Sequence, residues 1–261
     1  MATAPHHRFS HGDPSKGLPA EIKVLDRQAA RRLDEAAINR LGIPGIVLME
    51  HAAQSVRRVC DHMRRQEGLR RVVVVCGPGN NGGDGYALAR LLAIDGIETV
   101  LVCLGSPRDG SDAAKNAQIC KALEIPIRTP ESLQELLDHP CLLVDALFGT
   151  GLDRPLSEEA QAIVTQLNAS ESPVLAIDIP SGLDVNTGRP LGSAVRADCT
   201  VTMVAIKPAM LEVGSERYLG EVVVGDIGTP PALLEEFARV VPAPAADVET
   251  KPPPPPPRRG P

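Results

Sequence analysis

Aromatic side chains are scarce in this chain of 261 residues, which contains no Trp, two Tyr and three Phe. A surface that binds bases or sugars by stacking needs more aromatic rings than these. Charge excludes a second class of partner, because the formal net charge is -6 and the sequence holds no basic tract that could neutralise phosphates. We therefore expect no nucleic acid among the main partners of this protein.

Patterns typical of oxidised and membrane-bound proteins are also missing. The six cysteines are Cys60, Cys76, Cys103, Cys120, Cys141 and Cys199. No two of them form a CxxC pair and four lie in apolar, strand-like runs, so we expect reduced core residues of a cytoplasmic protein. No apolar stretch approaches the roughly 18 residues of a membrane span, and the N-terminus has no apolar signal region. We therefore expect no membrane association.

Both ends of the chain have the composition of disordered segments. Residues 1–20 are polar, rich in Gly and Pro, and carry three of the six histidines, for which a metal site is the less favoured alternative. From residue 242 the chain runs into six consecutive prolines, a polyproline II pattern in which an inert spacer is favoured over an SH3-type ligand. We expect disordered tails at 1–20 and 242–261 around one folded domain at 21–241.

Between these ends, hydrophobic residues follow two periodicities in alternation. Helical spacing predicts helices over residues 22–37 and 47–59, and near 84–95, 112–123, 131–138 and 158–168. Short apolar runs predict buried strands at 72–76, 99–104, 141–147, 174–179, 200–204 and 221–224. This alternation indicates an α/β fold with a mostly parallel sheet that is buried on both faces. The last two strands are close in the sequence, and an antiparallel or edge pair is expected there.

Three of these strands run directly into segments that combine glycines with carboxylates, amides or hydroxyls. The segments are Gly77–Gly85 (GPGNNGGDG), Asp145–Pro155 (DALFGTGLDRP) and Asp178–Asp184 (DIPSGLD). In open α/β sheets, ligands bind in the crevice beyond the carboxyl ends of the strands. One such segment could be an ordinary turn, but three at the same edge predict a binding site.

The first of these segments contains the spacing GxGxxG at Gly77, Gly79 and Gly82. An ordinary dinucleotide-binding fold has an acidic residue at the end of the next strand, whereas here that strand ends in Cys103-Leu104. No GK[ST] follows, so a Walker loop is excluded as well. What remains is a strand-to-helix turn whose amides can approach an anion at a helix N-terminus. The alternative is a tight turn with Gly and Asn at positive φ.

Two aspartates, Asp145 and Asp178, each follow an apolar strand run. Either one alone could cap the next helix or turn, whereas both together with Asn81 and Ser181 could converge on a cation through oxygen ligands. Oxygen-only coordination suits hard cations, and carbonyl-rich glycine loops suit a large, weakly held cation such as K⁺. Spacing alone leaves K⁺, Mg²⁺ and no metal open.

These three segments closely resemble those of a known family. The motifs GPGNNGGDG, VDALFGTGL and DIPSGLD occur in that order, together with LME at 48–50, VTMVAIK at 201–207 and GEVVVGDIG at 220–228. On these motifs, residues 22–235 are similar to the NAD(P)H-hydrate epimerase family, also called the YjeF N-terminal domain. The resemblance implies a Rossmann-like three-layer αβα sandwich, often dimeric. It also implies an isomerase that interconverts the R and S forms of hydrated NADH or NADPH in cofactor repair.

The resemblance also implies roles for individual residues. The substrate-binding residues would be Asn80, Asn81, Gly82, Gly83 and Asp84, followed by Gly149, Thr150, Gly151, Leu152, Asp153, Arg154 and Pro155. Asn81, Asp145 and Ser181 match the potassium ligands of the family, which implies one K⁺ per subunit. Asp178 matches the carboxylate that contacts the substrate. Lys207 is included only as an auxiliary candidate.

The chain departs from the family pattern in two places. The family commonly reads MENAG where this chain has MEHAA at 49–53, and His51 is expected to be a packing or surface substitution on a helix face. Many bacterial relatives continue into a dehydratase domain, whereas this chain runs into polyproline. We therefore expect the protein to act with a separate dehydratase that is specific for the S form. The resemblance also implies a homodimer.

For the implied reaction, Asp178 is the expected catalytic residue. Departure of the hydroxyl from C6 of the reduced nicotinamide ring needs a group that gives and takes a proton, while the ring nitrogen stabilises the cation. The Asn/Gly loop would hold the pyrophosphate. The competing hypothesis is a non-catalytic ligand-binding or scaffold module, because fold alone does not settle function. Retention of Asn81, Asp145, Asp178 and Ser181 favours the enzyme.

Overall fold

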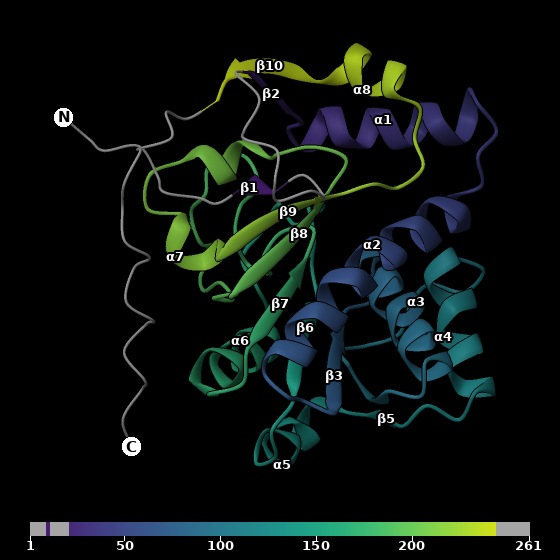
Figure 1. Cartoon of the computed structure of the whole chain (residues 1–261), viewed down its shortest axis with the longest axis vertical. Helices are drawn as coiled ribbons and strands as arrows, with labels where there is room; N and C mark the ends of the chain where they lie inside the picture. The colour runs from purple at the N-terminus through teal and green to yellow at the C-terminus, as the bar shows by residue number, and fades with distance from the viewer. Residues whose placement is uncertain (1–8, 11–20, 244–261) are drawn as a thin grey trace.

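Eight parallel strands form the central sheet of this protein, and Figure 1 shows this sheet among the helices. The computed structural model describes residues 9–10 and 21–243. Neighbouring strands follow the order β1 (Phe9–Ser10), β9 (Glu221–Gly225), β8 (Cys199–Met203), β7 (Val174–Ile177), β6 (Leu142–Ala146), β3 (Arg71–Cys76), β4 (Glu98–Cys103) and β5 (Ile127–Arg128). All pairings within this sheet are parallel. The expected α/β fold with a mostly parallel sheet is therefore confirmed.

Burial on both faces of the sheet explains the continuous apolar sequences of its strands. In β3, Val72 and Val74 pack into one core cluster, whereas Val73 and Val75 pack into a second cluster on the opposite face. All four valines are fully buried. Because successive side chains of a strand point to opposite faces, a sheet covered on both faces requires apolar residues at every position.

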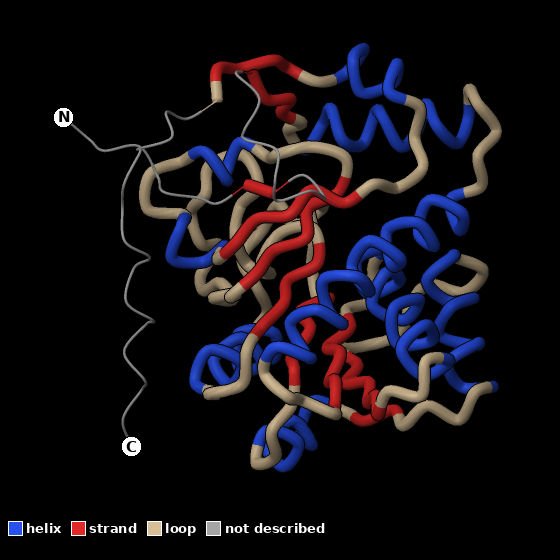
Figure 2. The backbone as a smooth tube through the Cα atoms, in the orientation of Figure 1, coloured by secondary structure: helices blue, strands red, loops and turns tan. Residues whose placement is uncertain are grey.

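Helices cover the two faces and complete a three-layer αβα sandwich (Figure 1 and Figure 2). One face carries α2 (Gly45–Gln66), α3 (Asn80–Ile94) and α4 (Asp112–Ala122), which share the core cluster of Val72. The other face carries α6 (Glu158–Ala169) and α5 (Leu133–Leu137), which follows the 3-10 turn η1 (Pro130–Ser132). The Rossmann-like sandwich implied by the resemblance is thus confirmed.

The winding of the chain places one crevice at the carboxyl edge of the sheet. From β3 the chain moves outward through β4 to β5 and then returns to β6, on the other side of β3. In doubly wound sheets, ligands bind at such a reversal of strand order. The segments that follow β3 and β6 therefore flank the crevice that the topology predicts as a binding site.

A smaller antiparallel sheet and two helices lie over this carboxyl edge, at the top of Figure 1. These elements are β2 (Glu21–Val24), α1 (Arg27–Asn39), α8 (Pro231–Phe237) and β10 (Arg239–Pro242). The helix expected over residues 22–37 is wrong at its start, because Ile22 lies in β2. Helix α1 begins only after Asp26, whose carboxylate accepts the Ala29 N–H (2.7 Å) as the N-cap.

Apolar packing holds α1 in place over the strand ends. Leu33 and Ala37 of α1 share a core cluster with Ala205, which follows β8, and with Leu233 of α8. All four side chains are nearly inaccessible to solvent. The position of α1 relative to the carboxyl edge is therefore set by buried contacts with the chain after β8 and with α8.

Two other expectations from periodicity are corrected by the structure. Strands β8 and β9 pair in parallel rather than antiparallel, because η2 (Pro208–Leu211) and α7 (Glu216–Leu219) carry the chain back between them. Helix α3 begins at Asn80 rather than near residue 84, so glycines of the first loop lie inside its first two turns. Glycine has a low helix propensity, which hides this helix start in the sequence.

The segment expected as a disordered N-terminal tail contributes one short strand. Phe9 and Ser10 pair in parallel with Val222 and Val223 of β9. Residues 1–8, 11–20 and 244–261 lie outside the described residues, and the expectations for the histidines and the polyproline run fall there.

All six cysteines are free thiols in the structure. Five of them are buried and Cys103 is partly buried. Burial raises the pKa of Cys60, Cys120 and Cys199 to about 12, so these thiols stay protonated and behave as small apolar residues. Over the residues that the structure describes, no helix is both long and apolar enough to cross a membrane.

Candidate active site

A cleft of about 910 Å³ opens between α1 and the carboxyl ends of the strands. One wall is formed by side chains of α1, among them Ala30 and Asp34. The other wall is formed by the segments that follow β3, β6, β7 and β8. The cleft therefore lies at the edge where the three glycine-rich segments predicted a site.

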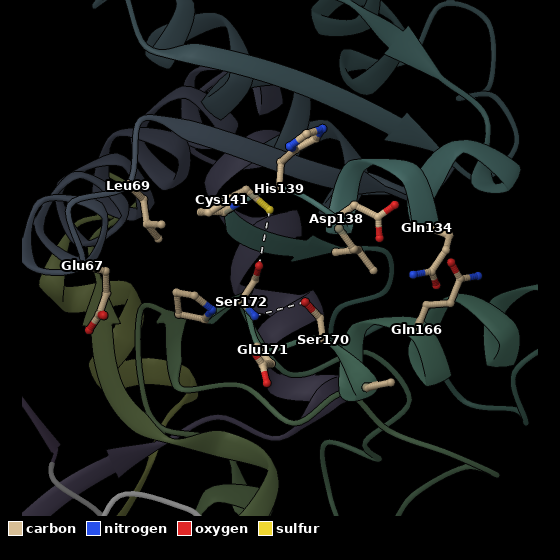
Figure 3. Close-up of a pocket in the computed structure, with 14 residues that line it drawn as sticks. Glu67, Leu69, Gln134, Asp138, His139, Cys141, Gln166, Ser170, Glu171 and Ser172 are labelled. Carbon is tan, nitrogen blue, oxygen red and sulfur yellow. Dashed lines mark hydrogen bonds between the residues drawn. The ribbon is translucent and has the colours of Figure 1, made fainter. Parts of the chain in front are cut away.

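A second cavity of about 510 Å³ lies at the opposite, amino edge of the sheet (Figure 3). It is lined by residues around the starts of β6 and β7, among them His139, Cys141 and Ser172. The Sγ of Cys141 lies 3.6 Å from the Oγ of Ser172, and burial raises the pKa of this thiol. None of the three glycine-rich segments contributes to this cavity. We therefore take the cleft at the carboxyl edge as the candidate site.

Glycines after β3 allow backbone segments to approach one another closely. A Cβ on Gly77 would lie 2.0 Å from the carbonyl oxygen of Leu147, and a Cβ on Gly82 would lie 1.9 Å from the carbonyl oxygen of Gly77. No residue between 77 and 85 has a positive φ. The alternative of a tight turn with Gly and Asn at positive φ is therefore wrong, because these glycines are required for space rather than for their φ.

The N-terminus of α3 opens on the cleft without a side-chain cap. Its N-cap is Gly79, which has no side chain to accept a hydrogen bond from the first turn. Gly79, Asn80 and Asn81 all line the cleft. The buried Nδ2 of Asn81 has no hydrogen-bond partner within the described part of the chain. Unpaired donors at a helix N-terminus favour an anionic ligand.

Asp145 and Ser181 form a buried hydrogen-bonded pair. The Ser181 hydroxyl donates to Oδ1 of Asp145 (2.6 Å), and the Ser181 N–H donates to Oδ2 (2.7 Å). The Leu147 N–H adds a bond to Oδ1 (3.2 Å), and the Phe148 N–H donates to the Ser181 hydroxyl oxygen (2.8 Å). Burial raises the pKa of Asp145 to about 6, and the bonds from Ser181 and Leu147 limit this rise. The pair ties the segments after β6 and β7 together.

Asp178 lies in an unusual turn directly after β7. Its φ is 66°, and the Ile179 N–H donates to the carbonyl oxygen of Ile177 (2.8 Å) across it. Such a γ-turn with positive φ is rare and strained. The Asp178 Oδ2 accepts the Thr150 N–H (3.1 Å), which links this side chain to the segment after β6. The side chain of Asp178 remains 13% exposed, on the cleft side.

A second turn with positive φ follows β8 and is held by Lys207. Val204 has a φ of 68°, which is uncommon for a β-branched residue. The Lys207 ammonium donates to the carbonyl oxygens of the residues before and after Val204 (2.8 and 2.9 Å) and to the Thr202 hydroxyl (2.9 Å). All three donors of the ammonium are therefore occupied. Its Nζ lies 3.4 Å from Oδ1 of Asp178, so Lys207 acts there as a buried positive charge.

Side chains from two of the strand ends converge at Gly149. A Cβ on Gly149 would lie 3.0 Å from Oδ1 of Asn81 and 3.0 Å from Oδ2 of Asp178. Glycine therefore leaves open the space that any larger residue would fill. The amide of Asn81 and the carboxylate of Asp178 are brought together at this point from segments nearly a hundred residues apart.

Arg27 at the start of α1 anchors the segment after β6, and the sequence did not predict this role. Its guanidinium donates to the carbonyl oxygens of Thr150 (2.9 Å) and Leu152 (2.6 Å), and to the carboxylate of Asp184 (2.7 Å). Burial alone would raise the pKa of Asp184, but the bonds from Arg27 and Thr187 hold it below its usual range. These partners are more than 120 positions from Arg27, beyond the reach of any local pattern.

Six carboxyl groups line the cleft, and the charges of three of them, Asp34, Asp84 and Asp178, act on one another. Enclosure in the cleft raises the pKa of Asp34 to about 6, with a further increase from Asp178 and an opposing effect of Lys207. Burial raises the pKa of Asp84 well above its usual value, and the charges of Asp178 and Asp34 add to this. Asp34 was not predicted as a site residue, because its sequence signal is only a polar position on α1.

Most of the predicted substrate-binding residues line the cleft. Its lining includes Asn80, Asn81, Asp84, the whole of Gly149–Pro155, Asp178 and Lys207. Gly82 and Gly83 do not line it, because they pack against Gly77 and Met49. Asp145 and Ser181 are also outside the lining, which leaves Asn81 as the one predicted metal ligand at the cleft surface. His51 is exposed and its ring packs beside Gly228.

The cleft therefore combines two kinds of chemistry. The N-terminus of α3 suits a phosphate-bearing ligand. Carboxyl groups with raised pKa values suit proton exchange near neutral pH. Between them, apolar side chains such as Leu48 and Phe148 provide a surface for an uncharged ring.

Several known proteins have sequences similar to this chain. Residues 45–209 match the family model described as YjeF-related protein N-terminus. A Limosilactobacillus fermentum protein named NAD(P)H-hydrate epimerase is 39% identical over 197 residues, which cover 75% of this chain and 92% of the relative. A Pirellula staleyi protein of the same name is 38% identical over 222 residues, which cover 82% and 96%. A bifunctional NAD(P)H-hydrate repair enzyme, Nnr, from Thermanaerovibrio acidaminovorans is 38% identical, and 42% of its length is covered.

A solved structure agrees with these matches. The crystal structure of the yeast protein ynu0 (YNL200c) superposes with a TM-score of 0.72 at 25% identity, covering 83% of this chain and 93% of the yeast chain. The family model spans more than half of this chain, and the first two relatives are covered over nearly their whole length. The family model, the sequence identity and the fold agree, and the chain belongs to the family of YjeF-related protein N-terminal domains.

Proposed function

We propose that this protein is an NAD(P)H-hydrate epimerase, an isomerase that interconverts the R and S forms of hydrated NADH and NADPH. The main support is the convergence of Asn81 and Asp178 at Gly149, within one cleft at the carboxyl edge of the sheet. Relatives of 38 and 39% identity carry the name of this activity. The cleft also contains both chemical elements that the substrate requires, an anion site and proton-transfer groups.

In the proposed reaction, Asp178 exchanges a proton with the hydroxyl on C6 of the reduced nicotinamide ring. General acid–base catalysis of this kind contributes about 10²–10⁴-fold in rate. The N-terminus of α3 would bind the pyrophosphate and so orient the ring. Lys207 would hold the turn after β8 and keep a positive charge beside Asp178. Arg27 would fix the segment that carries Gly149.

Incubation of the pure R hydrate with this protein tests the proposal. Formation of the S hydrate, followed by chromatography, is expected to exceed the spontaneous rate by about 10²-fold or more. The same measurement without protein provides the baseline. Equal rates with and without protein, combined with binding of the hydrate, would instead support the competing hypothesis of a non-catalytic ligand-binding module.

A potassium ion is the proposed metal, with Asn81, Asp145 and Ser181 as its side-chain ligands. The Asp145 carboxylate is fully buried and forms no ion pair within the described ranges, so a cation there would offset an uncompensated charge. The same ranges hold no group of three or more His, Cys, Asp or Glu that could bind a metal. The available donors are carboxylate, hydroxyl and amide oxygens, which suit a large, weakly held cation. When bound, the ion would supply positive charge beneath the cleft.

Removal of one proposed ligand is expected to abolish the potassium response of the protein. The melting temperature of the wild type should rise when choline chloride is replaced by potassium chloride at equal ionic strength, because a ligand stabilises the state that binds it. Asn81→Ala should lose this rise without losing a protein hydrogen bond, since its Nδ2 is unpaired. Asn80→Ala, the adjacent amide on α3, is the control and should keep it. An equal response in Asn81→Ala and the wild type would contradict the assignment.

The expected partners and compartment stay predictions. A bifunctional repair enzyme, of which this chain covers 42%, supports a functional link to a second activity. We propose that this second activity is a separate, S-specific dehydratase. The free state of all six cysteines is consistent with the proposed cytoplasmic location, where thiols stay reduced. The proposed homodimer rests on the family resemblance alone.

A further inference from the structure

Two of the carboxyl groups that line the cleft come from different walls. Asp178 follows β7 at the carboxyl edge of the sheet, whereas Asp34 lies on α1, the helix that covers this edge. The two groups are near enough for the charge of Asp178 to act on Asp34. Leu33, the residue before Asp34, is buried against the chain after β8, and this packing fixes where Asp34 lies.

Asp34 has no structural role that accounts for its position. Within residues 21–243, its carboxylate takes part in no hydrogen bond and no ion pair. The other carboxylates around α1 have such roles, since Asp26 caps the helix and Asp184 pairs with Arg27. Asp34 is solvent-exposed, so its carboxylate is open to a ligand that enters the cleft. An unpartnered carboxyl group beside other carboxyl groups in a cleft is typical of functional sites.

Inversion at C6 requires chemistry on both faces of the nicotinamide ring. The hydroxyl leaves from one face, and the water that replaces it must add to the other face. A general acid or base acts only within about 2.6–3.2 Å of the oxygen that it serves. One carboxyl group therefore cannot serve both faces of a ring that is held in a single pose.

Building on the function proposed above, we propose that Asp34 is a second catalytic acid–base residue, which serves the ring face opposite to the face served by Asp178. In one direction, protonated Asp178 gives its proton to the departing hydroxyl. The C6–O bond breaks, its electron pair leaves on water, and the lone pair of the ring nitrogen stabilises the cation. Solvent water then forms a new C6–O bond on the other face and gives its proton to ionised Asp34.

The reverse reaction uses the same steps with the two carboxyl groups exchanged. Each inversion takes one proton from the first carboxyl group and gives one to the second, and exchange with solvent restores the pair. One water leaves for each water that enters, so no oxidant or other reactant is needed. A pKa of about 6 at Asp34 supports this role, because such a group is present in both forms near neutral pH. The charges that act on it are Asp178 and Glu35, which raise its pKa, and Lys207, which lowers it.

Oxygen exchange separates the two faces experimentally. Each pure hydrate is incubated in ¹⁸O-water with the wild type, Asp34→Asn or Asp178→Asn, and the separated epimers are analysed by mass spectrometry. In Asp34→Asn, inversion should fall by about 10²-fold, while one of the two hydrates still exchanges its hydroxyl oxygen without inverting. Asp178→Asn should show the same behaviour with the other hydrate. General damage to the site would not produce this reciprocal dependence on the epimer.

Controls make the test independent of folding. Asp34→Ala removes the same carboxyl group with a strong helix former, and should repeat the result of Asp34→Asn. Asp109→Asn removes a carboxylate at an exposed position outside the cleft, and should invert both hydrates at close to the wild-type rate.

Three results would contradict the inference. They are wild-type inversion by both Asp34 variants, exchange of the same hydrate by the Asp34 and Asp178 variants, and loss of all exchange in the Asp34 variants. Failure of the proposed function is distinguishable from these, because the wild type would then neither invert nor exchange either hydrate.

Discussion

Replacement of Asp178 by asparagine is expected to lower the rate of epimerisation by about 10²-fold or more, a barrier increase of roughly 2.7 kcal/mol. Asparagine keeps an oxygen that can accept the Thr150 N–H, and it tolerates the φ of 66° better than most residues. It cannot, however, give and reclaim a carboxyl proton. The variant should therefore stay folded while the chemical step fails. The rate is measured from each pure hydrate by chromatography.

Binding decides how the loss of rate is interpreted. The affinity for the hydrate, measured by calorimetry, should change little in Asp178→Asn if the carboxyl group acts mainly in the transition state. If affinity and rate fall together, Asp178 anchors the substrate instead. If the rate survives, the proton is handled elsewhere, and a bound water is then favoured over Lys207, whose three donors are occupied. Asp109→Asn, at an exposed position outside the cleft, is the control for the substitution itself.

A single methyl group on Gly82 is expected to destabilise the protein by roughly 3 kcal/mol or more. The added Cβ would lie 1.9 Å from the carbonyl oxygen of Gly77 and 2.8 Å from its carbonyl carbon. Both atoms belong to the backbone, so no side chain can rotate away to relieve the contact. The turn between β3 and α3 must move instead. For a domain of this size, the melting temperature should fall by roughly 6–12 °C.

Gly79→Ala is the matched control in the same turn. A Cβ at Gly79 has no neighbour within 4 Å, and its φ of -94° suits an L-residue. Its melting temperature should therefore stay within about 2 °C of the wild type, because surface substitutions usually change stability by less than roughly 0.5 kcal/mol. Similar losses in both variants would mean that this turn requires glycine for a reason other than the approach of Gly77.

Local patterns were sufficient to predict strands β3, β4, β6, β7, β8 and β9 and the edge at which the site lies, but not the short strands β1, β2, β5 and β10. Apolar runs such as Val72–Cys76 identify strands that are buried on both faces, because only such strands lack polar positions. Parallel strands share a carboxyl edge, so polar segments after three of them had to lie at the same edge. The pairing of β8 with β9 was not predictable in this way, because the short elements η2 and α7, which carry the chain back for a parallel crossover, were not predicted from the sequence.

The residues of the site were only partly predictable for a related reason. Asn81, Asp145 and Asp178 could be found because each lies in or just after a strand end and belongs to a distinctive motif. The arrangement among them depended on the tertiary structure, in which Asp145 bonds Ser181 below the cleft while Asn81 and Asp178 meet at Gly149. The need for glycine at position 77 could not be predicted either. A Cβ there would overlap the carbonyl oxygen of Leu147, which belongs to the segment after a different strand.

By itself, the sequence determined the class of the sheet, the order of its motifs and the strand ends that carry polar groups, since each follows from interactions between residues close along the chain. The tertiary structure alone decided the second wall of the cleft. In the sequence, Arg27 and Asp34 are ordinary polar positions of an amphipathic helix. They become part of the cleft because Leu33 and Ala37 pack this helix over the carboxyl edge. Their partners lie far away in the sequence. Periodicity records which face of a helix is buried, but not which distant surface buries it.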